Sequence, residues 1–124
     1  MLTDRKLVAF AAASDPERAR AFYGGMLGLR LVNEQLPFAL VFDANGTMLR
    51  VSMVAKVVAA PYTVLGWEVP DIAASIRELR DKGVGFQHYD GVPQDELGIW
   101  TAPGGARVAW FLDPDGNVLS LTQF

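Results

Sequence analysis

The side chains best suited to chemistry in this sequence are few and widely separated. Glu68 and His88, the only histidine, are candidates for general acid–base catalysis, because a carboxylate and an imidazole exchange protons readily in a suitable environment. Arg50 has the donor geometry to hold a carboxylate or a phosphate. Trp110 offers a broad ring face on which a planar molecule can stack. No arrangement of Ser, His and Asp indicates nucleophilic catalysis.

Each of these candidates also has a purely structural explanation. Glu68 is better explained by an ion pair with Arg50 or by exposure at the rim of a sheet, and Arg50 by pairing with a neighbouring acid. Trp110 fits stacking on a ligand and packing in the core equally well. His88 is more typical of a surface or edge histidine than of a catalyst.

The composition is typical of a folded protein and argues against several classes of partner and site. The chain has 124 residues, which suits one domain or two small modules that share a core. A net charge of −3 without a basic cluster argues against a nucleic acid partner. There is no cysteine, so disulfides, thiolate metal ligands and a cysteine nucleophile are excluded. No segment resembles a secretory signal or a membrane span, so we expect a cytoplasmic protein without a membrane partner.

The first half of the chain predicts a strand, a helix and three further strands. Ser14-Asp15-Pro16 carries the signals of a helix start, and Gly28 is a suitable stop. Asn45-Gly46 is typical of a tight hairpin. The strands are expected at residues 7–13, 29–33, 38–43 and 47–54.

The second half repeats this order, with four expected strands in place of three after its helix. Pro70-Asp71 opens a helix that ends near Gly83, at nearly the same spacing as Asp15 and Gly28. Its strands are expected at residues 63–69, 84–89, 99–102, 107–112 and 118–124. The prediction is an α+β fold with two βαβββ modules, about residues 1–56 and 61–124, in a single domain. We expect one curved mixed sheet with helices on its convex face and a ligand cleft on its concave face.

The sequence resembles the vicinal oxygen chelate superfamily, which includes glyoxalase I, extradiol dioxygenases, and fosfomycin- and bleomycin-resistance proteins. The resemblance covers nearly the whole chain and implies paired βαβββ modules, a ligand cleft and a homodimer. The modules can pair within one chain or swap between two chains. The motifs that carry it are Ser14-Asp15 with Ala21-Phe22-Tyr23 and Leu27-Gly28-Leu29, then Glu68-Val69-Pro70-Asp71-Ile72 with Leu79 and Lys82-Gly83-Val84, and finally Asp113-Pro114-Asp115-Gly116-Asn117-Val118-Leu119.

The resemblance also locates the positions at which metal-dependent members hold a divalent ion with His, Gln and Glu. These positions fall on Val8, Val64 and Ser120, with the remaining one near Arg50. Valine has no lone pair, the serine hydroxyl is a weak neutral ligand, and the guanidinium is a permanent cation. The resemblance therefore implies a member without the usual metal ligands, and we expect no metal and no cofactor.

Strand alternation predicts which side chains share the cleft, because alternate residues point to the same face of a sheet. The expected cleft is apolar and aromatic, with few polar groups. Trp100 fits either the mouth of this cleft or a dimer interface. The predicted ligand-binding residues are Phe10, Arg50, Ser52, Glu68, Trp100, Trp110, Leu112 and Ser120.

The function that fits best is a glyoxalase/bleomycin-resistance-like protein that binds a small aromatic or amphipathic molecule in an apolar cleft without a metal. The alternative is a metal-dependent lyase, isomerase or dioxygenase of the same superfamily. Metal-free acid–base catalysis by Glu68 or His88 is a third hypothesis, so whether the protein is an enzyme stays open at this point.

Overall fold

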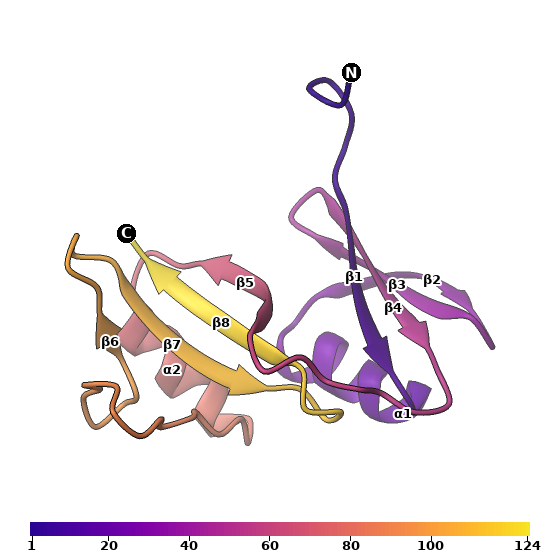
Figure 1. Cartoon of the computed structure of the whole chain (residues 1–124). Helices are drawn as coiled ribbons and strands as arrows, with labels where there is room; N and C mark the ends of the chain where they lie inside the picture. Colours follow the sequence, from indigo (N-terminus) through magenta and orange to yellow (C-terminus); the bar gives the residue numbers. More distant parts are fainter. The chain divides into compact units, whose positions relative to one another are not determined.

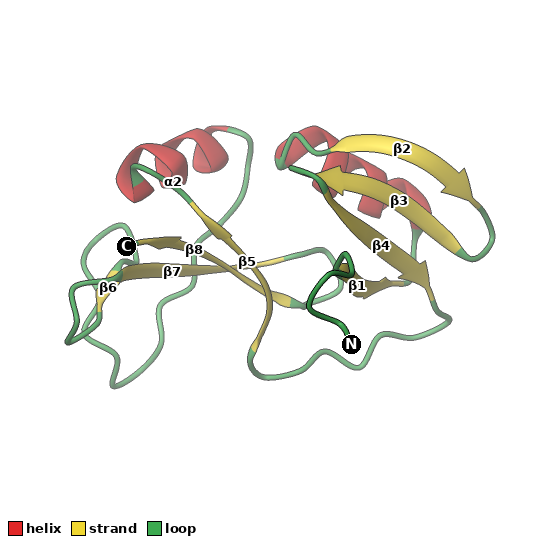
Figure 2. Cartoon of the chain, turned by 90° about the horizontal axis from the view of Figure 1, so that it is seen from above, coloured by secondary structure: helices red, strands yellow, loops and turns green.

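The computed structural model describes residues 1–124 as two compact units, Met1–Val58 and Ala59–Phe124 (Figure 1). Each unit contains a four-stranded mixed sheet, so the strands form two separate sheets rather than one. In each unit a helical segment lies over one face of its sheet (Figure 2). The α+β class and the two modules predicted from the sequence are confirmed.

Unit 1 (Met1–Val58) has the expected strand, helical segment and three further strands. Its sheet has the order β1-β4-β3-β2, with β1 parallel to β4 and the other neighbours antiparallel. The turn between β3 and β4 has positive φ angles at Asn45 and Gly46, as the hairpin signal predicts. The elements are β1 (Val8–Ala13), α1 (Pro16–Ala19), η1 (Arg20–Met26), β2 (Arg30–Gln35), β3 (Ala39–Ala44) and β4 (Thr47–Met53).

The helical segment of unit 1 begins and ends where the sequence predicts. The Asp15 carboxylate caps the first turn by accepting the backbone N–H of Glu17 at 2.9 Å. The chain leaves the segment at Gly28, whose φ of 74° suits glycine. The segment widens into a π-helix at η1, where the N–H of Leu27 reaches the carbonyl of Phe22. The sequence pattern did not predict this widening.

The core of unit 1 lies between the helical segment and its sheet. Leu40 and Phe42 on β3 and Leu49 on β4 are buried, and the Tyr23 ring lies 5.9 Å from that of Phe42. Alternate residues point the other way, so Phe10 is 59% exposed. We call the sheet face opposite the helical segment the open face of unit 1.

Unit 2 (Ala59–Phe124) has the sheet order β5-β8-β7-β6 and one helix. The Asp71 carboxylate caps this helix by accepting the backbone N–H of Ala74 at 3.1 Å. Ile72 and Ile76 point to the sheet and are fully buried. Like α1 and η1 of unit 1, this helix could not span a lipid bilayer. The elements are β5 (Thr63–Glu68), α2 (Ile72–Asp81), β6 (Trp100–Thr101), β7 (Arg107–Leu112) and β8 (Val118–Gln123).

The predicted strand at residues 84–89 is wrong. Only Phe86 forms an isolated bridge there, with Phe111 on β7. The side-chain amide of Gln94 takes the place of a strand partner, because it donates to the carbonyls of Gln87 and Gly98 and accepts the N–H of Tyr89. Residues 84–98 are consequently an irregular segment, in which the Gln94 side chain joins three backbone positions.

Two smaller differences concern the strand ends in unit 2. The strand expected at residues 99–102 is reduced to Trp100–Thr101, because the Asp95 carboxylate accepts the N–H of Ile99 at 2.9 Å. On β5 the pairing shifts between Thr63 and Leu65, which leaves Val64 as the extra residue of a bulge.

The turn that joins β7 to β8 depends on one buried carboxylate. Asp113 is only 5% exposed, and its oxygens accept the backbone N–H groups of Asp115 and Asn117 and the side-chain amide of Asn117, at 2.7–2.9 Å. The turn sets the register of the two strands, in which Trp110 pairs with Ser120. A change at Asp113 should therefore affect the sheet as well as the turn.

We expect Asp113→Ala to lower the free energy of unfolding by about 2–3 kcal/mol, because it leaves buried N–H donors without a partner. Urea unfolding followed by tryptophan fluorescence measures this, since Trp67, Trp100 and Trp110 all lie in unit 2. The control is Asp90→Ala, at an exposed loop residue. Equal stability of the two variants would show that the carboxylate does not hold the turn.

Candidate functional site

The open face of unit 1 brings three predicted ligand-binding residues together. Phe10 on β1 pairs with Arg50 on β4, which pairs in turn with Val41 on β3. Ser52 lies two residues further along β4 and therefore points to the same face. The structure thus places Phe10, Arg50 and Ser52 side by side, as strand alternation predicts.

Arg50 is half-buried and has a neutral partner. Its Nη2 donates to the side-chain oxygen of Gln35 on β2, at 2.8 Å. The two side chains span the intervening strand β3, where Ala39 and Val41 are buried. Within unit 1 the expected acidic partner is therefore replaced by an amide, which leaves the charge of the guanidinium uncompensated. An ion pair between Arg50 and Glu68 stays a prediction.

Unit 2 also has an open face, opposite α2, and most of the other predicted residues lie on it. Gly66 on β5 pairs with Ser120 on β8, and Ser120 pairs with Trp110 on β7. Leu112 lies two residues beyond Trp110 and is 36% exposed. The intervening Phe111 is fully buried toward α2, as the alternation predicts.

Three rings gather on the open face of unit 2. The Trp110 ring lies 6.2 Å from that of Trp100, with the planes tilted by 31°, and 5.7 Å from that of Tyr89 in an edge-on arrangement. We call Tyr89, Trp100 and Trp110 the aromatic cluster. The sequence analysis missed Tyr89, because it lies in the irregular segment where strand alternation gives no guidance.

The contact between Gly66 and Ser120 is unusually close. A Cβ atom built on Gly66 would lie 2.6 Å from the Ser120 hydroxyl oxygen, well inside any normal contact distance. The hydroxyl therefore occupies the space that a side chain at position 66 would need. Only glycine at this position leaves the hydroxyl where it is, one strand away from the Trp110 ring.

The two catalytic candidates are not brought together. Glu68 is exposed on β5, at one edge of the sheet. Across the sheet, the paired residues Thr122 and Val108 lie between it and Trp100 on β6, at the other edge. At the usual strand spacing, Glu68 and Trp100 are about 14 Å apart. His88 is exposed and lines a hollow of about 180 Å³ that does not include Glu68. The other lining residues of this hollow are Arg80, Phe86, Glu96 and Leu97. Acid–base catalysis by Glu68 or by His88 would therefore use one of them alone, and it stays a prediction.

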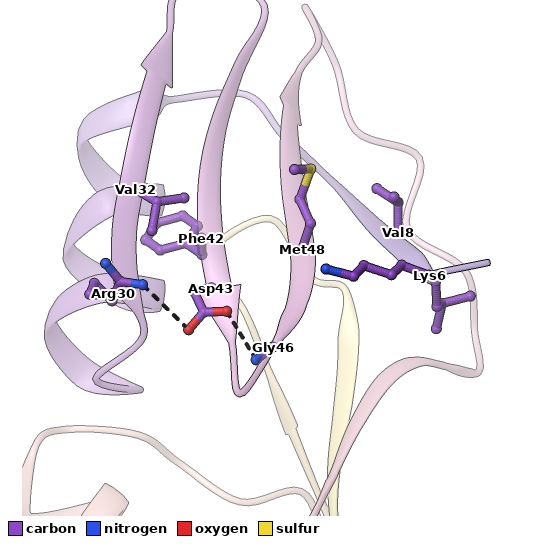
Figure 3. Close-up of a pocket in the computed structure, with 9 residues that line it drawn as sticks. Lys6, Val8, Arg30, Val32, Phe42, Asp43, Gly46 and Met48 are labelled. Atoms are coloured by element: carbon purple, nitrogen blue, oxygen red, sulfur yellow. Dashed lines mark hydrogen bonds and ion pairs between the residues drawn. The ribbon is translucent and has the colours of Figure 1, made fainter. Parts of the chain in front are cut away.

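A larger pocket, of about 270 Å³, opens on unit 1 (Figure 3). The sequence analysis did not predict it, because Lys6 precedes β1 and Val32 lies at an irregularity in β2. Val8 was already singled out as an expected metal position, and Met48 could also have been found, since it precedes Arg50 by two residues on the same strand. The lining residues are Lys6, Leu7, Val8, Arg30, Val32, Phe42, Asp43, Gly46 and Met48.

The residues at the expected metal positions do not fit a divalent cation. Val8 and Val64 have no donor atoms, Ser120 offers one neutral hydroxyl, and Arg50 carries a positive charge. No three side chains of His, Asp or Glu come close enough elsewhere to form a metal site. The residues at these positions therefore offer apolar contact, hydrogen bonding and attraction of anions rather than coordination of a cation.

Comparison with known proteins identifies relatives over nearly the full length. Residues 7–121 match the family model for the Glyoxalase/Bleomycin resistance protein/Dioxygenase superfamily. No curated protein gives a match. A solved member of the same superfamily from Sphaerobacter thermophilus DSM 20745 is 26% identical, with 95% of this chain and 97% of that chain covered and a TM-score of 0.71.

Two solved structures with established names share the fold at lower identity. Lactoylglutathione lyase from Agrobacterium tumefaciens is 16% identical, with 97% of this chain and 93% of that chain covered and a TM-score of 0.74. A fosfomycin resistance protein from Listeria monocytogenes is 13% identical, with 95% and 91% covered and a TM-score of 0.75. At such identities the likeness shows the fold alone.

We expect Gly66→Ala to destabilise the protein by about 1–3 kcal/mol, because the new methyl group displaces the Ser120 hydroxyl. Adding Ser120→Ala should recover part of this loss, and a double-mutant cycle by thermal unfolding measures the coupling. Gly104→Ala is the control, since a Cβ there meets nothing within 4 Å. Additive effects of the two changes would contradict the close contact.

Proposed function

Because the chain belongs to the Glyoxalase/Bleomycin resistance protein/Dioxygenase superfamily, we propose that it binds a small aromatic or amphipathic molecule without a metal ion. The observation that carries this proposal is the aromatic cluster of Tyr89, Trp100 and Trp110 on the open face of unit 2. Fold alone supports many functions in any superfamily, so the argument rests on these side chains.

The cluster is unlike the aromatic residues that form the core of unit 2. Phe111 is fully buried on the α2 side, whereas Trp100 and Trp110 are half-buried and Tyr89 is 39% exposed on the other side. Rings that remain accessible in a group offer contact area that a planar ligand can cover. The arrangement therefore favours a binding surface over simple packing.

The polar groups beside the cluster are few and suited to orienting a ligand. Ser120 pairs directly with Trp110 but is only 7% exposed, whereas Thr122, two residues further along β8 on the same face, is half-buried. An apolar surface with a small number of hydroxyl groups is typical of sites for small molecules. Neither hydroxyl has a histidine beside it in the sheet, so these residues support binding rather than nucleophilic catalysis.

The side chains at the expected metal positions support ligand binding without a metal ion. Val64 and Ser120, at the expected metal positions of unit 2, supply one neutral oxygen between them. A metal-dependent lyase, isomerase or dioxygenase needs several imidazole or carboxylate ligands around its ion. Binding and sequestration need only the rings and hydroxyls that are present.

We expect N-phenyl-1-naphthylamine, a neutral planar fluorescent probe, to bind saturably to the protein. Trp110→Leu should weaken binding about tenfold, because loss of ring stacking and apolar contact costs about 1.4 kcal/mol. A fluorescence titration of the probe at fixed protein concentration gives both affinities.

Trp67→Leu is the matched control, because Trp67 pairs with the buried Leu121 and points to the α2 side of the same sheet. Far-UV circular dichroism checks that both variants are folded. An equal loss of probe binding in the two variants would argue against the aromatic cluster as the site. Uptake of one equivalent of nickel, zinc, manganese or iron that is required for binding would favour the metal-dependent alternative.

A further inference from the structure

We propose that the pocket of unit 1 binds small organic anions, in which a carboxylate or phosphate group is attached to an apolar body. This pocket lies wholly within Met1–Val58 and is built from other residues than the aromatic cluster, so it does not depend on the function proposed above. Three features carry the inference: an apolar floor, an excess of positive charge, and acidic side chains that are already engaged.

The floor of the pocket is a single cross-strand row on the open face of unit 1. Val8 pairs with Met48, Met48 pairs with Asp43, and Asp43 pairs with Arg30 (Figure 3). The row is therefore apolar at its β1 end and charged at its β2 end. With a volume of about 270 Å³, the pocket suits a molecule about the size of one substituted ring.

Large apolar side chains around the pocket remain open to solvent. Met48 and Val32 are each 44% exposed, and Val8 is 38% exposed. An apolar ligand that covers them gains free energy in proportion to the area removed from water. The pocket thus has an attraction for hydrophobic matter that is independent of charge.

Positive charge predominates in and beside the pocket, although the whole protein carries a net charge of −3. Lys6 forms no ion pair, and Figure 3 shows its side chain running toward Met48. Arg30, at the β2 end of the floor, is the second cation that lines the pocket, and one of its guanidinium nitrogens lies 3.8 Å from Asp43. Both cations can therefore interact with an anionic group on a ligand.

The neighbouring carboxylates are already engaged. Asp43 accepts the backbone N–H of Gly46 at 3.0 Å and lies 3.8 Å from a guanidinium nitrogen of Arg30. Glu17 and Glu34 accept hydrogen bonds from the Arg20 guanidinium, which raises its pKa above the ordinary value. Asp4 pairs with Arg5, and Asp15 pairs with Arg18. Lys6 is thus left without an acidic partner, which favours an external anion.

Methionine methyl NMR tests the proposal directly. The chain has Met1, Met26, Met48 and Met53, and only Met48 lines the pocket, so its 13C-methyl signal reports on occupancy. The signal is assigned by its loss in Met48→Leu. We expect sodium benzoate to shift it saturably at constant ionic strength, and benzamide, the neutral isostere, to bind at least tenfold more weakly. Phenyl phosphate is titrated in the same way. Whichever of the two anions binds more tightly identifies the preferred acidic group.

Charge variants supply the matched comparison. Lys6→Gln and Arg30→Gln should each weaken benzoate binding several-fold and leave benzamide unchanged, whereas Lys56→Gln, an exposed cation outside the pocket, should leave both unchanged. Equal binding of benzoate and benzamide, an equal effect of all three substitutions, or a shift that never saturates would each overturn the proposal. Since Met48 lies in unit 1 and every tryptophan in unit 2, failure here is distinct from failure of probe binding at the aromatic cluster.

Discussion

A single helical segment covers only one face of each four-stranded sheet, and the chemistry available to this protein depends on the side chains of the other face. In both units the residues that alternate toward the helix make the core, such as Leu49 in unit 1 and Phe111 in unit 2. Their neighbours in the chain must point the other way. Arg50 and Trp110, which directly neighbour these core residues, are therefore held rigidly on an accessible surface by the same strands that stabilise the core.

The two units share a topology but present different surfaces. The open face of unit 1 combines exposed apolar groups with cations, as in the pairing of Phe10 with Arg50. The open face of unit 2 combines rings with hydroxyls, as in the pairing of Trp110 with Ser120. The same strand order thus carries different side chains at the outward positions of the two units. The absence of suitable donors at Val8 and Val64 is consistent with recognition by contact and charge rather than by coordination.

Much of the fold could be predicted because its signals are local. Asp15 and Asp71 cap their helices where the sequence indicates, and alternation correctly separates Phe111 from Trp110. The irregular segment at residues 84–98 could not be predicted, because its hydrogen bonds depend on a side-chain amide, that of Gln94. The hydrogen bond between Arg50 and Gln35 could not be predicted either, because it depends on the register of β2, β3 and β4. The pocket of unit 1 depends on that register too.

The hydrogen bonds of Gln94 also determine how the aromatic cluster is assembled. Tyr89 belongs to no strand, and its backbone N–H is bound by the Gln94 side chain. Trp110, by contrast, lies within β7, where the sheet positions it. The two neighbouring rings are thus placed by different kinds of hydrogen bond, one from a single amide and the other from a strand ladder. The spacing between these rings is therefore set by residue 94 as much as by the sheet itself.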